Sequence, residues 1–176
     1  MRKLLNEELE RLSIREYKEA SKVPVVVVLD NVRSQHNIGS VFRTADAFRL
    51  EGLILCGITA TPPHREIHKT ALGATESVSW EYRERTVDAI RELKEKGFRI
   101  LSVEQAKGAV SLEKMKLEPG VHYALVLGHE IRGVNQEVVN LSDQCIEIPQ
   151  FGTKHSLNIS VAAGIVIWEV FRQLPI

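Results

Sequence analysis

The run "VVVVL" at residues 25–29 decides the fold class of this 176-residue chain. A continuous β-branched run of this kind is typical of a strand buried on both faces, which is the usual state of strands in a parallel sheet. The segment "NIGSVFRTADAF" (37–48) follows with apolar residues at helical spacing, and "EGLILCG" (51–57) then predicts the next strand. The order strand, helix, strand therefore begins an α/β domain.

The same alternation continues to the end of the chain. Further helices are predicted over 86–97, around 136–140 and from about 158 to 173, and further strands over 98–103, 122–128 and 144–150. Alternating strands and helices predict a mostly parallel sheet with helices on both faces. The segment 57–80, with its two adjacent prolines, shows the least regular pattern, and we expect a surface excursion over the strand ends there.

Composition indicates one globular domain of ordinary size, because 44% of the residues are apolar and 26% are charged. Apolar positions among charges over residues 3–20 predict an amphipathic helix, so we divide the chain into a helical arm (1–22) and a main domain (23–176). The 23 basic and 23 acidic residues cancel. Any nucleic-acid surface must therefore be a local patch or be assembled by oligomerisation.

The cysteines and the apolar runs indicate in which cellular compartment we expect the protein. Cys56 and Cys145 lie far apart in strand-like runs and form no C-x-x-C pair, which favours a reduced, cytoplasmic protein. The N-terminus is too charged for a signal peptide, and the longest apolar stretch, 161–168, is too short for a membrane span. The glutamate of "HREIH" (64–68) is misplaced for an H-E-x-x-H motif, so we expect no metal site.

Three loops that follow predicted strands carry glycine together with side chains that can hydrogen-bond. They are "DNVRSQHNIGSVFR" (30–43), "HEIRG" (129–133) and "QFGTKHSLN" (150–158). In open parallel sheets, ligands bind beyond the carboxyl ends of the strands. The sequence therefore predicts a functional site where these loops meet.

The segments that contain these loops resemble the three motifs of the SpoU/TrmH branch of the SPOUT superfamily. The segments are "DNVRSQHNIGSVFRTADAF" (30–48), "LVLGHEIRGV" (125–134) and "IPQFGTKHSLNISVAAGI" (148–165), and the resemblance extends from about Pro24 to Leu174. It implies a deep C-terminal trefoil knot. It also implies a homodimeric enzyme that transfers a methyl group from S-adenosylmethionine to a ribose 2′-hydroxyl of tRNA or rRNA.

Two other functions remain open from the sequence. The first is a non-catalytic RNA-binding or assembly module that retains the knotted cofactor pocket, which the altered "HEIRG" loop suggests. The second is an unrelated nucleotide-binding enzyme. Neither G-x-G-x-x-G nor G-x-x-x-x-G-K-[ST] follows any predicted strand, which argues against this alternative.

The resemblance also implies which residues act. The catalytic candidates are Asn37, Arg43, Glu130, Ser156 and Asn158. The candidates for cofactor binding, mainly through backbone and apolar contacts, are Gly128, Ile148, Leu157, Val103 and Gly133.

Several of these residues also have a plainer interpretation. Arg43 is either the group that deprotonates the ribose hydroxyl or a cation that binds phosphate and stabilises the oxyanion, and without the motif it is a solvated helix arginine. Asn37 can equally be a helix N-cap, and Glu130 a surface loop acid. His129 is either a proton acceptor or a structural hydrogen-bonding group.

The closing helix is apolar around most of its circumference, which a single small domain cannot cover, so the sequence predicts a homodimer. The residues expected to be buried on this helix are Ile159, Val161, Ala162, Ile165 and Val166. Arg65, Lys69 and Lys154 are candidates for contacts to the RNA backbone.

Overall fold

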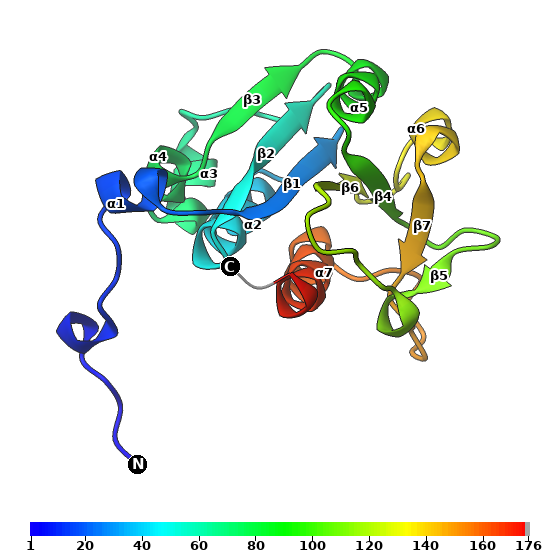
Figure 1. Cartoon of the computed structure of the whole chain (residues 1–176). Helices are drawn as coiled ribbons and strands as arrows, with labels where there is room; N and C mark the ends of the chain where they lie inside the picture. The colour runs from blue at the N-terminus through cyan, green and yellow to red at the C-terminus, as the bar shows by residue number, and fades with distance from the viewer. Residues whose placement is uncertain (175–176) are drawn as a thin grey trace.

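A seven-stranded parallel sheet forms the centre of the protein in the computed structural model, which describes residues 1–174 (Figure 1). The strands are β1 (Val23–Asp30), β2 (Leu50–Cys56), β3 (Trp80–Arg83), β4 (Arg99–Val103), β5 (Val110–Ser111), β6 (Tyr123–Gly128) and β7 (Gln144–Glu147). Their order is β3-β2-β1-β6-β4-β7-β5, and every neighbouring pair is parallel. The predicted parallel sheet is confirmed.

Helices connect these strands. The α-helices are α1 (Ile14–Glu19), α2 (Gln35–Ala47), α3 (Arg65–Ala71), α4 (Ala74–Ser77), α5 (Thr86–Glu95), α6 (Gln136–Leu141) and α7 (Ile159–Gln173). Two 3₁₀ turns, η1 (Asn6–Leu9) and η2 (Leu112–Lys114), complete the set within residues 1–174. None of the helices in that part of the chain is long and apolar enough to cross a membrane.

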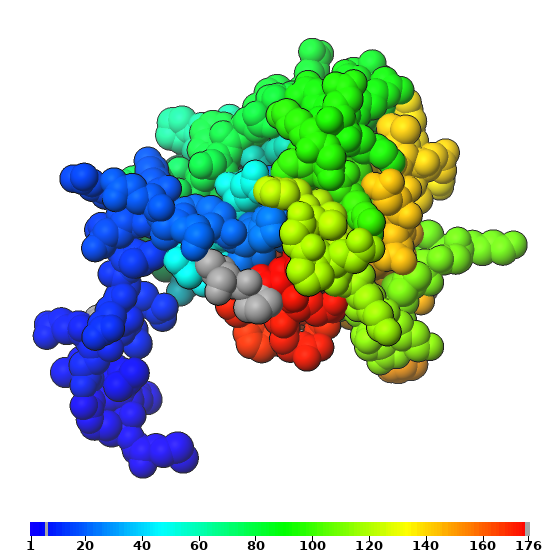
Figure 2. All heavy atoms as spheres, viewed as in Figure 1, coloured from blue at the N-terminus to red at the C-terminus, as the bar shows by residue number. Residues whose placement is uncertain are grey.

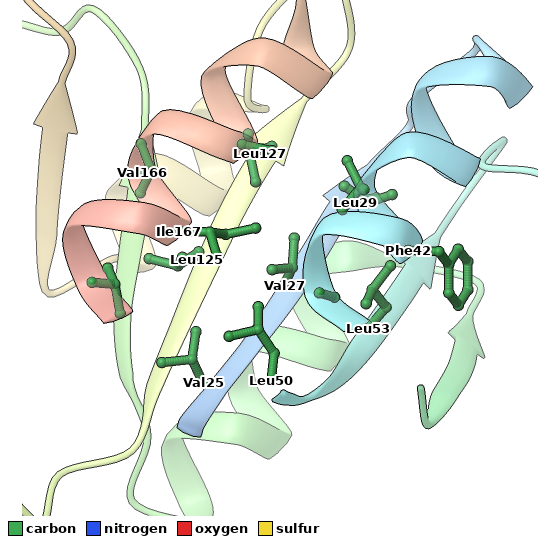
Figure 3. Packing of buried hydrophobic residues seen from close by; sticks show 14 of the residues in the cluster. Val25, Val27, Leu29, Phe42, Leu50, Leu53, Leu125, Leu127, Val166 and Ile167 are labelled. Carbon is green, nitrogen blue, oxygen red and sulfur yellow. The ribbon is translucent and has the colours of Figure 1, made fainter. Parts of the chain in front are cut away.

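Strand β1 shows why the valine run specifies a sheet covered on both faces. Val25 and Val27 point into a core shared with α2 and α7, whereas Val26 points into a second core shared with α5 and α6. Figure 3 shows the first core, where Val166 and Ile167 of α7 lie over the sheet. Full burial of each such side chain contributes about 1.5–3 kcal/mol, so both faces favour this placement.

The strand order reverses between β1 and β6. The chain runs outward from β1 to β2 and β3, and it then returns to the other side of β1 for β4 to β7. Such a reversal opens a crevice beyond the carboxyl ends of the strands, because the following loops diverge to opposite sides. The loops that follow β1, β6 and β7 are the three that the sequence singled out.

The segment 57–80 differs from the predicted irregular excursion. It forms α3 and α4, which pack against α2, and Ile67 and Ala71 are buried there. A Cβ at Gly39 of α2 would lie 2.3 Å from the carbonyl oxygen of Ile67, so glycine lets the two backbones approach closely. The contact that orders this segment is therefore distant in sequence.

The N-terminal segment also differs from its prediction. Instead of one helix over residues 3–20, the two short elements η1 and α1 form. Glu10, with a left-handed φ of 46°, ends η1, and Ser13 caps the start of α1. Residues before α1 extend away from the main body (Figure 2). The division at residues 22 and 23 and the C-terminal knot stay predictions.

Candidate active site

A cavity of about 310 Å³ lies at the carboxyl ends of β4, β6 and β7, bounded on one side by the start of α7. Of the candidate residues, those that line it are Val103, Gly128, Glu130, Gly133, Ile148, Ser156 and Leu157. The remaining three, Asn37, Arg43 and Asn158, do not line it. The structure thus brings together all of the predicted cofactor-binding residues and two of the five predicted catalytic ones.

The loop after β6 closes on itself and forms one wall of the cavity. The His129 N–H donates to the Gly133 carbonyl oxygen at 3.0 Å, and the Gly133 N–H donates back at 2.8 Å. A Cβ on Gly128 would lie 2.1 Å from the Gly133 carbonyl carbon, and Gly133 itself has a φ of +67°. Gly128 requires glycine because no side chain fits between the two backbone segments, and Gly133 requires it because of its left-handed φ and the adjacent Glu104 carboxylate.

Glu130 projects from this loop to the loop that follows β1. One carboxylate oxygen accepts from the Arg33 N–H at 3.1 Å, and the other accepts from the Ser34 N–H at 2.9 Å. The second oxygen also accepts from Asn37 Nδ2 at 3.3 Å. Burial acts to raise the pKa of Glu130, but these donors outweigh it and hold the pKa below its ordinary value. Glu130 is thus an ordered anion that joins two motif loops.

Helix α2 begins beside Glu130. Ser34 caps it by accepting from the Asn37 N–H at 3.3 Å, so the prediction that Asn37 is the N-cap is wrong. Because Ser34 takes that role, the Asn37 amide is available to bond Glu130. Arg43 lies six residues further along α2, about 9 Å away at 1.5 Å per residue, and is exposed. Its guanidinium has no hydrogen-bond or ion-pair partner within residues 1–174.

The third motif loop leads directly into α7. Asn158 is the N-cap, and its Oδ1 accepts from both the N–H and the hydroxyl of Ser160, at 2.8 and 2.7 Å. Its side chain therefore shapes the start of the helix. Ser156 and Leu157, just before it, are exposed on the cavity wall. Helix α7 begins within one residue of its predicted start.

The expected burial along α7 is confirmed on the face that packs against the sheet. Ile159 and Val166 are buried and Ala162 is partly buried, but Val161 is 50% exposed and Ile165 is 38% exposed. The last two point away from the sheet. No element within residues 1–174 covers that face, so the burial of these two residues in the expected dimer interface stays a prediction.

Sequence reasoning missed Glu104 and Gln105, which follow β4 and line the cavity. Glu104 accepts from the Val134 N–H at 2.9 Å, and the Gln105 side chain donates to the His155 carbonyl oxygen at 2.7 Å. The loop after β4 thereby holds both the second and the third motif loops. The available signal was the polar pair directly after a buried strand.

His129 has a structural hydrogen bond. Its Nδ1 accepts from the Ile131 N–H at 3.0 Å, which places the proton of the neutral ring on Nε2.

Of the cations predicted to contact RNA, Lys69 pairs with Glu66 at 2.7 Å, and Arg65 is 4.0 Å from the same carboxylate. The part of the chain that the structure describes holds no group of three or more side chains suited to a metal ion.

The parallel sheet and the cavity beyond its carboxyl edge define an α/β protein with a ligand site at the strand ends. Residues 24–168 match the model of the SpoU rRNA Methylase family, and the chain belongs to this family. It is 34% identical over 175 residues to the tRNA (guanosine(18)-2′-O)-methyltransferase of Aquifex aeolicus, a match that covers 97% of this chain and 78% of that protein.

Other relatives are longer than this chain. A TrmH family relative from Staphylococcus aureus (strain MSSA476) is 34% identical over 160 residues, and this match covers 91% of the chain but only 63% of the relative. Among solved structures, the A. aeolicus TrmH/SpoU tRNA modifying enzyme superposes with a TM-score of 0.80 at 31% identity, covering 91% of this chain and 80% of that one. The AdoMet-bound rRNA methyltransferase from Sinorhizobium meliloti superposes with a TM-score of 0.81 at 29% identity, and the match covers 90% of this chain and 60% of that one.

Proposed function

We propose that this protein transfers a methyl group from S-adenosylmethionine to a ribose 2′-hydroxyl of tRNA or rRNA. The observation that carries the proposal is the cavity at the carboxyl ends of β4, β6 and β7, which the second and third motif loops wall together. Support comes from the A. aeolicus relative, named as a tRNA 2′-O-methyltransferase, and from the S. meliloti rRNA methyltransferase, whose structure contains AdoMet.

Both the loop after β6 and the apolar side chains that line the cavity suit such a cofactor. Gly128 and Gly133 let the loop after β6 close on itself, and this loop lines the cavity. Val103, Ile148 and Leu157 supply apolar contact for adenine and for the methionine chain. Bound there, S-adenosylmethionine would supply a methyl group that a ribose oxygen can attack, and the sulfur would leave as the neutral thioether of S-adenosylhomocysteine.

The protein's own residues have separate roles in this proposal. Glu130 is a positioning residue, because it binds the backbone ahead of α2 and the Asn37 amide. Ser156 lies on the cavity wall where its hydroxyl can contact the substrate. Asn158 fixes the start of α7 and so the course of the loop that carries Ser156.

Arg43 points to a second copy of the chain. It is exposed on α2 and does not line the cavity of its own chain, and we propose that it contacts the ribose bound at the cavity of a partner subunit. A guanidinium stays protonated in proteins, which favours the role of binding phosphate and stabilising the developing oxyanion over that of a base.

A homodimer would also cover the exposed face of α7. Val161, Ile165 and Trp168, which is 53% exposed, form an apolar stripe on that face. The Trp168 ring lies 5.9 Å from Phe48 at the end of α2, so the stripe continues onto the helix that carries Arg43. One interface could therefore bury the stripe and deliver Arg43.

We also propose a cytoplasmic location. Both cysteines are free thiols, Cys56 buried and Cys145 partly buried, and burial raises the pKa of Cys56 to about 12. A thiol with so high a pKa is almost entirely protonated and unreactive near neutral pH, as suits a structural cysteine in a reducing compartment.

Two measurements test the function in turn. Calorimetry with S-adenosylmethionine should show binding, and Leu157→Asp should weaken it. Incubation of the protein with bulk RNA and methyl-labelled cofactor should then give labelled ribose 2′-O-methyl nucleosides after digestion. Cofactor binding without any transfer would favour a non-catalytic RNA-binding or assembly module, and absence of cofactor binding would contradict the proposal.

A further inference from the structure

The edge strand β3 presents two aromatic side chains on an open face. Trp80 is 37% exposed and Tyr82 is 44% exposed, and they alternate with Glu81 on the opposite face. Residues two apart in a strand lie about 6.6 Å apart on the same side of a sheet. In Figure 1, β3 forms the border of the sheet, with α3 and α4 beside its first residues.

A second cavity lies between Trp80 and the start of α3. Its volume is about 530 Å³, and its walls include Trp80, Pro62, His64, Arg65 and His68. The His64 Nδ1 accepts from the Glu66 N–H at 3.2 Å, which fixes the ring and leaves Nε2–H as a donor. The Arg65 side chain is 85% exposed. Trp80 thus lines one cleft together with Arg65, His64 and His68.

We propose that this cleft binds an unpaired nucleotide of the RNA substrate, with its base against Trp80 and its phosphate near Arg65; the inference rests on the proposed function. Every base has a π-face that stacks on an aromatic side chain, and an exposed guanidinium pairs with phosphate. The cleft holds one carboxylate, Glu76, which can accept from the N–H groups of a base.

The cleft is joined to the helix that carries the catalytic candidates. The Thr70 hydroxyl of α3 donates to the His36 carbonyl oxygen of α2 at 2.9 Å, and His36 Nε2 lies 2.8 Å from a Glu66 carboxylate oxygen. A nucleotide held between α3 and β3 is therefore fixed relative to Asn37 and Arg43. We infer that the cleft sets which segment of a folded RNA reaches the methyl-transfer site.

Tryptophan fluorescence offers a direct test. The chain has two tryptophans, so Trp168→Phe leaves Trp80 as the single reporter. Titration with an unstructured oligoribonucleotide of about eight nucleotides should quench its emission in a saturable way. In the otherwise unchanged protein, Trp80→Ala should weaken binding of the same oligonucleotide about 5- to 100-fold, and Trp80→Phe should retain most of the affinity. Arg65→Ala should weaken binding less and reduce its dependence on salt.

Leu72→Ala is the matched control, because Leu72 is an exposed apolar residue of the same segment, 57–80, and does not line the cleft. Equal affinities of the Trp80→Ala and Leu72→Ala variants would overturn the inference, as would unquenched Trp80 at saturation. If calorimetry still shows cofactor binding and bulk RNA is still methylated, that failure leaves the proposed function intact. If RNA quenches Trp80 but the protein methylates no RNA, the result contradicts the proposed function and leaves the cleft assignment standing.

Discussion

The side-chain amide of Asn37 donates to the carboxylate of Glu130 at 3.3 Å, although 93 residues separate the two along the chain. The same carboxylate binds the backbone N–H groups of Arg33 and Ser34. The first and second motifs are therefore one hydrogen-bonded unit at the reversal of the strand order. Because α2 starts from this unit, Glu130 helps to fix the beginning of the helix that carries Arg43.

Replacing Glu130 by glutamine should lower the free energy of unfolding by about 1 kcal/mol at pH 7, since bonds to a half-exposed anion become bonds to a neutral amide. The pKa of Glu130 is below its ordinary value of 4.5, so this contribution is present above about that pH and is lost as pH falls through the lower folded value. Urea unfolding of both proteins at several pH values should show the difference shrinking in acid. Glu113→Gln, at an exposed glutamate, serves as the control.

Ile165→Asp should raise the dissociation constant of the proposed dimer about 100-fold or more, because an unpaired charge in an interface costs about 3 kcal/mol. Light scattering at micromolar concentration measures the effect. Ile58→Asp is the matched control, since Ile58 is similarly apolar and 63% exposed but lies outside α7. A monomeric mass for the wild-type protein would contradict the dimer outright.

Cofactor affinity and turnover should separate within the third motif. Leu157→Asp should weaken S-adenosylmethionine binding, because it places a charge where apolar contact is expected, and Leu157→Met should not. Ser156→Ala should lower turnover more than cofactor affinity, and Thr153→Ala, outside the cavity lining, should change neither. Calorimetry and single-turnover methyl transfer give the two quantities. The assignment of Ser156 is wrong if its alanine variant abolishes cofactor binding yet retains turnover at saturation.

Arg43→Ala should lower the rate of transfer by about 10²-fold or more, as for other lost oxyanion donors, while Arg43→Lys should retain part of the activity through its charge. Arg85→Ala, which removes an exposed arginine ahead of α5, is the control. A pH–rate profile under single-turnover conditions distinguishes the two roles. A base must lose its proton before it acts, so activity would rise with pH in a way that Arg43→Lys alters, whereas a cation that binds phosphate needs no such deprotonation. Near wild-type turnover of Arg43→Ala would rule out both roles.

The sequence alone determined the parallel sheet, the three loops and the boundaries of α7, because each depends on local signals. A valine run favours a strand buried on both faces, and Asn158 caps the helix that begins beside it. The tertiary structure alone decided the Glu130 contacts, the helices within 57–80 and the exposure of Val161 and Ile165. The Glu130 contacts and the helices within 57–80 depend on residues far along the chain, and the exposure of Val161 and Ile165 depends on which face of α7 packs against the sheet. The spacing of neighbouring residues encodes neither of these long-range contacts.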